Sequence, residues 1–428
     1  MNDKLIKEAE IDESAWLTLA AFNRLVKGRQ VVFFGVSDYW TEKTLKTTNV
    51  DLVYLVDNSE SLIGSTFKGY DIKSPEVLRD KSSDVFVVIT SGSYYDIYPQ
   101  LIEYGMKPGI DFCITPALNN SRVISEIHNH DAAILISSPD HKVYAGMDRG
   151  SDIGGGLYEY RLREQSVRKV VEGTFNQIVD AGDCYFATDE LRGICKISKD
   201  YEVIDVYGAE PGDKCMGVAY CPDRNIVFLG HTRYDTVSAH NADTSEKLFE
   251  IELSGKHRRL GRAQHWINDL HVAGDYLYIS MFSQSGAYLQ GVYDGGILQV
   301  DLEDTEKRYV LVRDAWMPHT VRFFDPQICY LDSMNGRFYR SIHKVVGEFP
   351  GFIRGLGYDG HYYYVGQSEN RDLQALKGIN RHISLSAGFY LFDEETKAAK
   401  FFATPSIRQI HDLCVIQPAE KNATTIAA

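Results

Sequence analysis

A short pattern that recurs six times in the second part of the chain constrains its fold most. Each segment has one or two polar or small residues followed by an aliphatic one, and successive segments begin about 35 to 57 residues apart. A turn and a further strand pattern follow the first five segments. Repeats of about 40–50 residues with four short strands are typical of β-propeller blades. The segments are residues 176–178, 216–218, 268–270, 319–321, 354–356 and 411–413.

The number of blades depends on the two ends of this repeat. A further blade fits residues 133–173, with Ile134 in the repeated column, and residues 411–417 then remain as a lone strand. We expect this strand to pair with the beginning of the domain and close the ring. The sequence therefore predicts a six-bladed propeller over residues 121–428, with seven blades as the alternative.

Strand and helix patterns alternate before the repeat begins. Alternation of this kind predicts parallel βαβ units. A chain of 428 residues is long enough for two domains. We therefore expect residues 1–120 to form a Rossmann-like α/β domain with an N-terminal helix. The strand patterns lie at 31–35, 52–56 and 84–89, and the helical patterns at 12–27, 40–45, 75–78 and 95–104.

Gly35, Asp57 and Ser91 follow the three predicted strands and are candidate cofactor-binding residues, because ligands bind at the carboxyl ends of parallel strands. The separation of Gly35 and Asp57 is close to that of the first glycine and the acidic residue in dinucleotide folds. The second and third glycines of that motif are missing, and Asp38 would repel a pyrophosphate. NAD is therefore not expected, although an NAD-dependent oxidoreductase stays an alternative beside a domain with no cofactor.

The residues most informative about function lie on the predicted innermost strands. The first strand of each blade lines the central channel, so residues at one register converge on one mouth. His319 and His411 are candidates for proton transfer or for binding a divalent metal ion. Asp269 and Asp412 would complete this catalytic site, and His231 or His271 could add a metal ligand. The alternative is that both histidines are merely hydrogen-bonded channel residues.

Arg354, Asn176 and Asn268 are candidate substrate-binding residues in the same channel. A buried Arg354 would either clamp a carboxylate or phosphate or form a salt bridge with Asp269 or Asp412. The two asparagines would orient a polar ligand or satisfy backbone groups. Two long excursions, 282–295 and 368–387, exceed ordinary hairpin loops, and we expect them to cap the mouth.

Three stretches of the propeller resemble a known family. Residues 316–322 (WMPHTVR), 349–356 (FPGFIRGL) and 365–371 (VGQSENR) are similar to bacterial, uncharacterised propeller-like proteins with the signature MPHSPR…PGFTRGL…VGLSxxR. The resemblance covers roughly residues 260–400 and departs at Thr320 and Val321, where the family has Ser-Pro. It implies no particular chemistry. Its motif positions are His319, Arg322, Arg354, Ser368 and Arg371, and among them Arg322, Ser368 and Arg371 are further substrate-binding candidates.

A second resemblance concerns residues 28–115. The strand–glycine turn, the Val56-Asp57-Asn58 sequence and residues 69–72 and 104–109 are similar to Rossmann-like domains beside bacterial sugar-modifying enzymes. Examples are domains of sugar O-acyltransferases and sugar C-methyltransferases. This resemblance implies a setting in carbohydrate metabolism and assigns no catalytic role to the domain.

Composition excludes several classes of function. The net charge is −14 without a concentrated basic face, which argues against nucleic-acid binding. The sequence contains no run of about 18 apolar residues, so no membrane span is expected. The acidic N-terminal sequence does not resemble a secretory signal, and seven cysteines without a CxxC pair suggest free thiols. We therefore expect a cytoplasmic protein.

The combined expectation is an enzyme that acts on a sugar or nucleotide-sugar in bacterial surface-glycan synthesis, with its site at the propeller mouth. A divalent metal would assist if the two histidines bind one. A non-catalytic binding or scaffold propeller is the principal alternative, and the sequence leaves homo-oligomerisation open.

Overall fold

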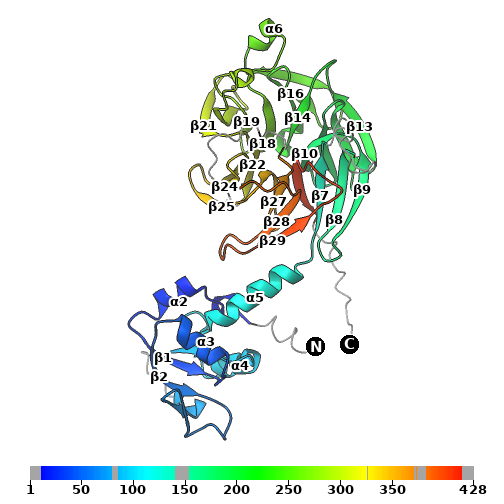
Figure 1. The fold of residues 1–428 in the computed structure, drawn as a ribbon. Helices are drawn as coiled ribbons and strands as arrows, with labels where there is room; N and C mark the ends of the chain where they lie inside the picture. The colour runs from blue at the N-terminus through cyan, green and yellow to red at the C-terminus, as the bar shows by residue number, and fades with distance from the viewer. Residues whose placement is uncertain are drawn as a thin grey trace. The chain divides into compact units, whose positions relative to one another are not determined.

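The computed structural model describes residues 11–79, 85–139, 154–324, 326–370, 373 and 382–416. The chain forms two compact units, Met1–Asn129 and His130–Ala428 (Figure 1). The division lies after residue 129, at the end of helix α5 (Pro116–Asn129). Within the described residues, no helix combines the length and apolar character that crossing a membrane requires.

The first unit contains a mixed α/β sheet, as predicted. Its strands are β1 (Gln30–Phe34), β2 (Asp51–Val56), β3 (Thr66–Phe67), β4 (Tyr70–Lys73), β5 (Val85–Ile89) and β6 (Phe112–Ile114), and its other helices are α2 (Leu19–Leu25), α3 (Trp40–Thr47) and α4 (Tyr94–Glu103). The strand order is β3-β4-β2-β1-β5-β6. β1 pairs in parallel with β2 and β5, and parallel pairs also join β2 to β4 and β5 to β6. The β3–β4 hairpin is antiparallel.

Two expected helices of this unit are shorter than predicted. The pattern over 12–27 yields α2 and a single 3₁₀ turn, Glu13–Ala15. The reason is that Thr18 caps α2 by accepting a hydrogen bond from Ala21 N (3.2 Å), while Trp16 forms a parallel bridge with Ile114. The segment Pro75–Leu78 is likewise a 3₁₀ turn rather than an α-helix.

The second unit is a propeller of six four-stranded blades, which confirms the prediction. The strands are β7 (Ala133–Ser138), β8 (Gly156–Arg161), β9 (Ser166–Glu172), β10 (Phe175–Asp180), β11 (Cys184–Asp189), β12 (Gly193–Ser198), β13 (Val203–Gly208), β14 (Cys215–Cys221), β15 (Ile226–His231), β16 (Thr236–Asn241), β17 (Lys247–Glu252), β18 (Ile267–Ala273), β19 (Tyr276–Met281), β20 (Gly295–Asp301), β21 (Arg308–Ala315), β22 (Pro318–Phe324), β23 (Gln327–Asp332), β24 (Arg337–Arg340), β25 (Val345–Glu348), β26 (Phe352–Tyr358), β27 (Tyr363–Ser368), β28 (Gly388–Phe392), β29 (Ala399–Ala403) and β30 (Asp412–Ile416). Blades 1 to 5 are β10–β13, β14–β17, β18–β21, β22–β25 and β26–β29, and blade 6 has the order β30-β7-β8-β9. A short helix, α6 (Lys256–Leu260), precedes β18.

The C-terminal strand closes the ring, as expected. β30 pairs antiparallel with β7, Asp412 opposite Ser137 and Leu413 opposite Ile136 (Figure 1). The assignment of Ile134 to the repeated column is wrong, because β7 is the second strand of blade 6 and β30 is its innermost strand. Strand β7 is mostly buried, so its apolar sequence alone does not distinguish an inner from a second strand.

In blades 1, 3, 4 and 6 the side chain of the second residue of the repeat forms hydrogen bonds to other blades. In each of β10, β14, β18, β22 and β26 the pairing register shifts at the repeat, so some backbone N–H groups leave the ladder of their own blade. Gln177 Oε1 accepts hydrogen bonds from Val218 N and Leu270 N, both 2.9 Å away. Asp412 Oδ2 accepts one from Ile178 N at 3.0 Å.

The second residue of the repeat also accepts hydrogen bonds from backbone N–H groups in blades 3 and 4. Asp269 Oδ1 accepts a hydrogen bond from Val321 N (3.3 Å), and Thr320 Oγ1 accepts one from Gly355 N (2.9 Å). Thr320 and Gly355 have positive φ angles of 57° and 80°, a backbone region that L-residues seldom adopt. Side chains at the second position therefore supply the partners that the bulged backbone lacks.

Replacing Gln177 with leucine should lower the free energy of unfolding by at least about 2 kcal/mol, because two buried N–H groups lose their acceptor. Gln177 Nε2 also donates to Leu270 O at 2.6 Å. Gly217 lies between these partners, and a Cβ there would be 2.8 Å from Leu270 Cγ. Urea unfolding of the full chain measures the effect, with exposed Gln290→Leu as control. Equal stability of the two variants would show that the channel bonds contribute little.

Candidate functional site

His319 and His411 meet at the channel mouth formed by the beginnings of the innermost strands. His319 lies on β22 of blade 4, and His411 directly precedes β30 of blade 6. Their ring centroids are 5.5 Å apart at an interplanar angle of 80°. Both side chains are buried, His319 with 1% and His411 with 0% of its surface exposed. Two residues that are 92 positions apart in the sequence thus form one pair.

The tautomer of His319 follows from its hydrogen bonds. Its Nδ1 lies 3.0 Å from the carbonyl oxygen of Met317 and 2.8 Å from Ser333 Oγ. A carbonyl oxygen only accepts, so Nδ1 carries the proton and Nε2 of the neutral ring carries the lone pair. Nε2 is therefore the basic nitrogen of this residue.

An aromatic collar packs against the His319 ring of the histidine pair. It consists of Trp266, Phe282, Tyr288, Tyr293 and Phe352. Phe282 and Phe352 lie edge-to-face with the His319 ring, with centroids 5.1 and 5.6 Å away. Trp266 stacks on Phe282 and contacts Tyr288, which in turn contacts Tyr293. The loop between β19 and β20 supplies three of these rings, so the described part of this excursion lies at the mouth.

The sequence pattern did not identify three members of this collar. Trp266 and Phe282 flank strands β18 and β19, and Phe352 begins β26. The sequence showed only that an aromatic residue lies near the repeat in blades 3 and 5. Core residues of a propeller have the same spacing, so this pattern does not distinguish a residue of the mouth from a core residue.

Ser368 and Gln409 bind the guanidinium of Arg354 at the mouth. Its Nε and Nη2 donate to Ser368 Oγ at 3.1 and 2.7 Å, and Nη2 also donates to Gln409 Oε1. Its guanidinium lies 5.3 Å from the centre of the Phe352 ring. Arg354 is 3% exposed. The structure thus joins the predicted residues Arg354 and Ser368, and adds Gln409, which lies outside the repeat.

The salt bridge considered for Arg354 is formed by Arg322 instead. Arg322 donates to Asp269 Oδ1 at 3.1 Å and to Asp412 Oδ2 at 2.5 Å, linking blades 3, 4 and 6. Burial raises the pKa of Asp269 to about 7; the Arg322 charge opposes this shift and the Asp412 charge adds to it. Burial likewise raises the pKa of Asp412. Asp269 and Asp412 thus connect the inner strands through Arg322 and backbone N–H groups.

Asn176 and Asn268 occupy equivalent positions in blades 1 and 3. Asn176 Nδ2 donates to Cys215 O (3.0 Å) and Asn268 Nδ2 to Pro318 O (2.8 Å), so each amide is fixed to the next inner strand. Both side chains are completely buried. Within the part of the chain that the structure describes, neither Oδ1 atom has a hydrogen-bond partner. Two fixed acceptor oxygens are therefore available to hydroxyl or amide donors.

Among the described residues, one group of three ligand-type side chains has its ligand atoms within 4.8 Å of one another, namely Asp213, Cys215 and His231. It does not include His319 or His411, whose metal-binding role stays a prediction. His271, the other histidine considered, stacks on Phe323. Burial lowers the pKa of His271 to about 3.

The candidate cofactor residues of the first unit lie together at one edge of its sheet. Asp57 Oδ2 accepts a hydrogen bond from Val36 N (2.6 Å), and Asp57 Oδ1 accepts one from Ser59 N (2.8 Å). A Cβ on Gly35 would lie 2.4 Å from Ser91 Cβ. Glycine is thus required for packing against Ser91, and both Asp57 oxygens already bind the backbone. Arg371 of the propeller lies outside the described residues.

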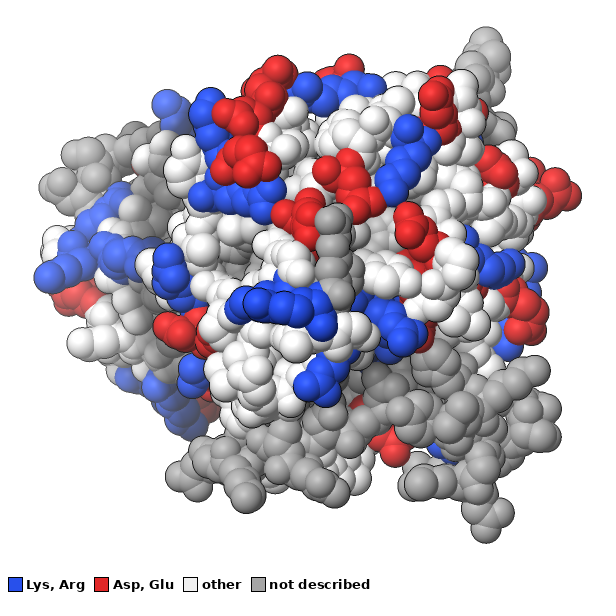
Figure 2. Space-filling model, turned by 90° about the horizontal axis from the view of Figure 1, so that it is seen from above, with Lys and Arg blue, Asp and Glu red and all other residues white. Residues whose placement is uncertain are grey.

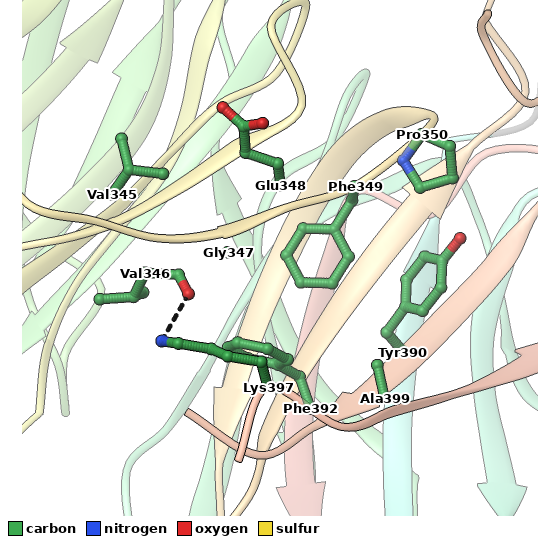
Figure 3. A pocket seen from close by; sticks show the side chains of 10 residues that line it. All are labelled: Val345, Val346, Gly347, Glu348, Phe349, Pro350, Tyr390, Phe392, Lys397 and Ala399. Atoms are coloured by element: carbon green, nitrogen blue, oxygen red, sulfur yellow. Dashed lines mark hydrogen bonds between the residues drawn. The ribbon is translucent and has the colours of Figure 1, made fainter. Parts of the chain in front are cut away.

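An open groove of about 380 Å³ lies between β25 of blade 4 and β28 and β29 of blade 5 (Figure 3). Phe349, Tyr390 and Phe392 line its floor, and Lys397 Nζ donates to Val346 O at 2.9 Å. On the surface seen in Figure 2, lysine and arginine side chains are interspersed with aspartate and glutamate.

Comparison with known proteins adds a family match. Residues 272–424 match a family described as "Domain of unknown function (DUF4915)". This region runs from the end of β18 to beyond β30 and includes His319, Arg354 and His411. No curated protein is significantly similar to the chain.

Solved structures resemble the chain at low sequence identity. A chain in the crystal structure of a nidogen/laminin complex is 10% identical, with 67% of this chain and 98% of that chain covered and a TM-score of 0.47. A protein of unknown function from Bacteroides caccae is 14% identical, with 67% and 100% covered and a TM-score of 0.46.

Proposed function

We propose that the protein is an enzyme that binds an anionic, hydroxyl-rich small molecule of the sugar or nucleotide-sugar class at the propeller mouth. The observation that carries this proposal is the convergence of His319 and His411 from separate blades, with ring centroids 5.5 Å apart. A pair of imidazoles at this separation can act on one small reacting group. The resemblance of residues 28–115 to domains of sugar-modifying enzymes supports the substrate class.

The surroundings of the pair fit such a ligand. The Arg354 guanidinium has a planar, permanently charged fork suited to a carboxylate or phosphate. The Oδ1 atoms of Asn176 and Asn268 can accept hydrogen bonds from hydroxyl groups. The aromatic collar offers flat apolar faces to the carbon skeleton of a sugar ring, and binding sites combine such apolar walls with a few fixed polar groups.

The proton chemistry follows from the His319 tautomer. Met317 O fixes the proton on Nδ1, so Nε2 can take a proton from a ligand hydroxyl. The positive charge that develops on the ring is stabilised by the Met317 carbonyl dipole. His411 then serves as the second proton-transfer group, on the other side of the same reacting group.

The binding part of the proposal is tested by thermal-shift measurements with glucuronic acid, UDP-glucuronic acid and glucose. We expect the two anionic compounds to raise the melting temperature and glucose to have little effect. Arg354→Met should remove the shift, whereas Arg337→Met, at an exposed ion pair with Glu348, should retain it. An unchanged shift in Arg354→Met would show that the anion binds elsewhere.

A further inference from the structure

Asp213, Cys215 and His231 form a buried cluster in blade 2, remote in sequence from the histidine pair of the mouth. Asp213 precedes β14, Cys215 begins β14, and His231 ends β15, directly opposite Cys215 in the register. One carboxylate oxygen, Asp213 Oδ2, lies 3.1 Å from Cys215 Sγ and is in hydrogen-bond contact with His231 Nδ1. A carboxylate, a thiol and an imidazole thus converge in the interior.

The hydrogen bonds behind His231 determine where its proton lies. His240 Nδ1 faces the carbonyl oxygen of Ser245 at 3.3 Å, so it carries a proton. Burial lowers the pKa of His240, so its ring is neutral and its Nε2 accepts the hydroxyl proton of Ser238 at 2.8 Å. Ser238 Oγ must then accept a hydrogen bond from His231 Nε2, 2.7 Å away. His231 Nε2 is therefore bound to Ser238, and Nδ1 is the ring nitrogen that faces Asp213.

This arrangement brings metal-ligand atoms together in the interior. His231 Nδ1 faces Asp213 Oδ2, and with Cys215 Sγ these ligand atoms lie within 4.8 Å of one another. The Cys215 sulfur provides a third ligand atom beside both. A set of one cysteine, one histidine and one aspartate suits Zn²⁺, and a hydrogen bond from the other ring nitrogen is the usual support of a zinc-binding histidine.

The cluster is not part of the repeat that the blades share. Ties between blades recur at the second position of the repeat, through Gln177, Asp269, Thr320 and Asp412. The register pair Cys215 and His231 does not recur. The corresponding pairs in the other blades with equivalent strands are Phe175 and Asp189, Ile267 and Met281, Pro318 and Asp332, and Phe352 and Ser368.

We propose that blade 2 binds one Zn²⁺ ion through Asp213 Oδ2, Cys215 Sγ and His231 Nδ1. Binding converts the Cys215 thiol to a thiolate and releases its proton to solvent. This site is independent of the proposed function at the mouth, so neither proposal depends on the other.

The test is the zinc content of the untagged full-length chain after dialysis against Zn²⁺ and then against metal-free buffer. We expect one equivalent of zinc in the wild type and less than about a tenth of that in Cys215→Ala and His231→Gln. Cys184→Ala, which removes another buried cysteine from the neighbouring blade, should retain the full equivalent. Far- and near-ultraviolet circular dichroism identifies any variant that has failed to fold.

A second measurement keeps the proposal testable if the variants unfold. Replacement of zinc by Co²⁺ in the wild type should give the intense thiolate-to-cobalt charge-transfer absorption, and this should be absent in folded Cys215→Ser. A zinc-free wild type, or zinc retained equally by Cys215→Ala and His231→Gln, would overturn the proposal.

Discussion

Replacing Arg322 with methionine is expected to lower the free energy of unfolding of the propeller by about 3–5 kcal/mol at pH 8. The substitution leaves Asp269 and Asp412 buried without a cation, and removing one partner of a buried ion pair has a cost of this size. Urea unfolding of the full chain measures it. Arg337→Met is the control, because the exposed pair with Glu348 contributes about 0–1 kcal/mol.

The loss should be smaller at pH 5 than at pH 8. Burial raises the carboxyl pKa values of Asp269 and Asp412 above their unfolded value of about 4, so the folded state binds more protons than the unfolded state at mildly acidic pH. The contribution of these groups to stability is therefore present at low pH and decreases as the pH rises through their folded pKa values. Without Arg322 both pKa values rise further, so acidification should restore part of the lost stability.

A compensated variant separates charge from packing. The triple variant Arg322→Met, Asp269→Asn and Asp412→Asn removes all three charges and should be more stable at pH 8 than Arg322→Met alone. If Arg322→Met were as stable as wild type at pH 8, the ion network would not hold the three blades together.

Ending the chain before β30 is expected to abolish the cooperative unfolding transition of the propeller. Without β30, β7 loses its inner partner, Arg322 loses Asp412, and Ile178 N loses its acceptor. Loss of β30 exposes the edge of an inner strand and opens the ring. We expect the lost stabilisation to be comparable with the whole stability of a domain, on the order of 5–15 kcal/mol.

The matched pair for this experiment is a chain of residues 1–411 and a chain of residues 1–416. Differential scanning calorimetry should show the propeller transition in the longer chain and not in the shorter one. A peptide of residues 410–416 added in excess should restore it by pairing with β7. Identical transitions in both chains would show that the ring does not depend on closure by β30.

The sequence predicted the architecture because its repeat records the blade period directly. It did not predict which residues of the repeat do what, because a bulge in five of the six inner strands adds a residue and breaks the simple alternation of facing sides. Asp269 and Asp412 were therefore grouped with the histidines, although they bind Arg322. Arg322 lies three positions after His319, across such a shift in register.

Other features lacked a pattern that sequence analysis could detect. Strand β6 has only three residues, and α5 contains several Asn and Ser residues that weaken its helical periodicity. The sequence placed Arg354 and Ser368 in family motifs. It did not predict that the two side chains form hydrogen bonds with each other. Gln409 and the buried Asp213–Cys215–His231 cluster depend on contacts between strands that are distant in sequence.

The central claim, that the histidine pair of the propeller mouth is the site of chemistry, is tested by the turnover of UDP-glucuronic acid, followed by chromatography of the nucleotide and sugar products. Wild type and His361→Gln, a substitution in an exposed turn, should convert the compound at equal rates. His319→Gln and His411→Gln should each lower the rate at least about 100-fold, the usual loss when a general acid or base is removed. Full activity of both mouth variants would contradict the account.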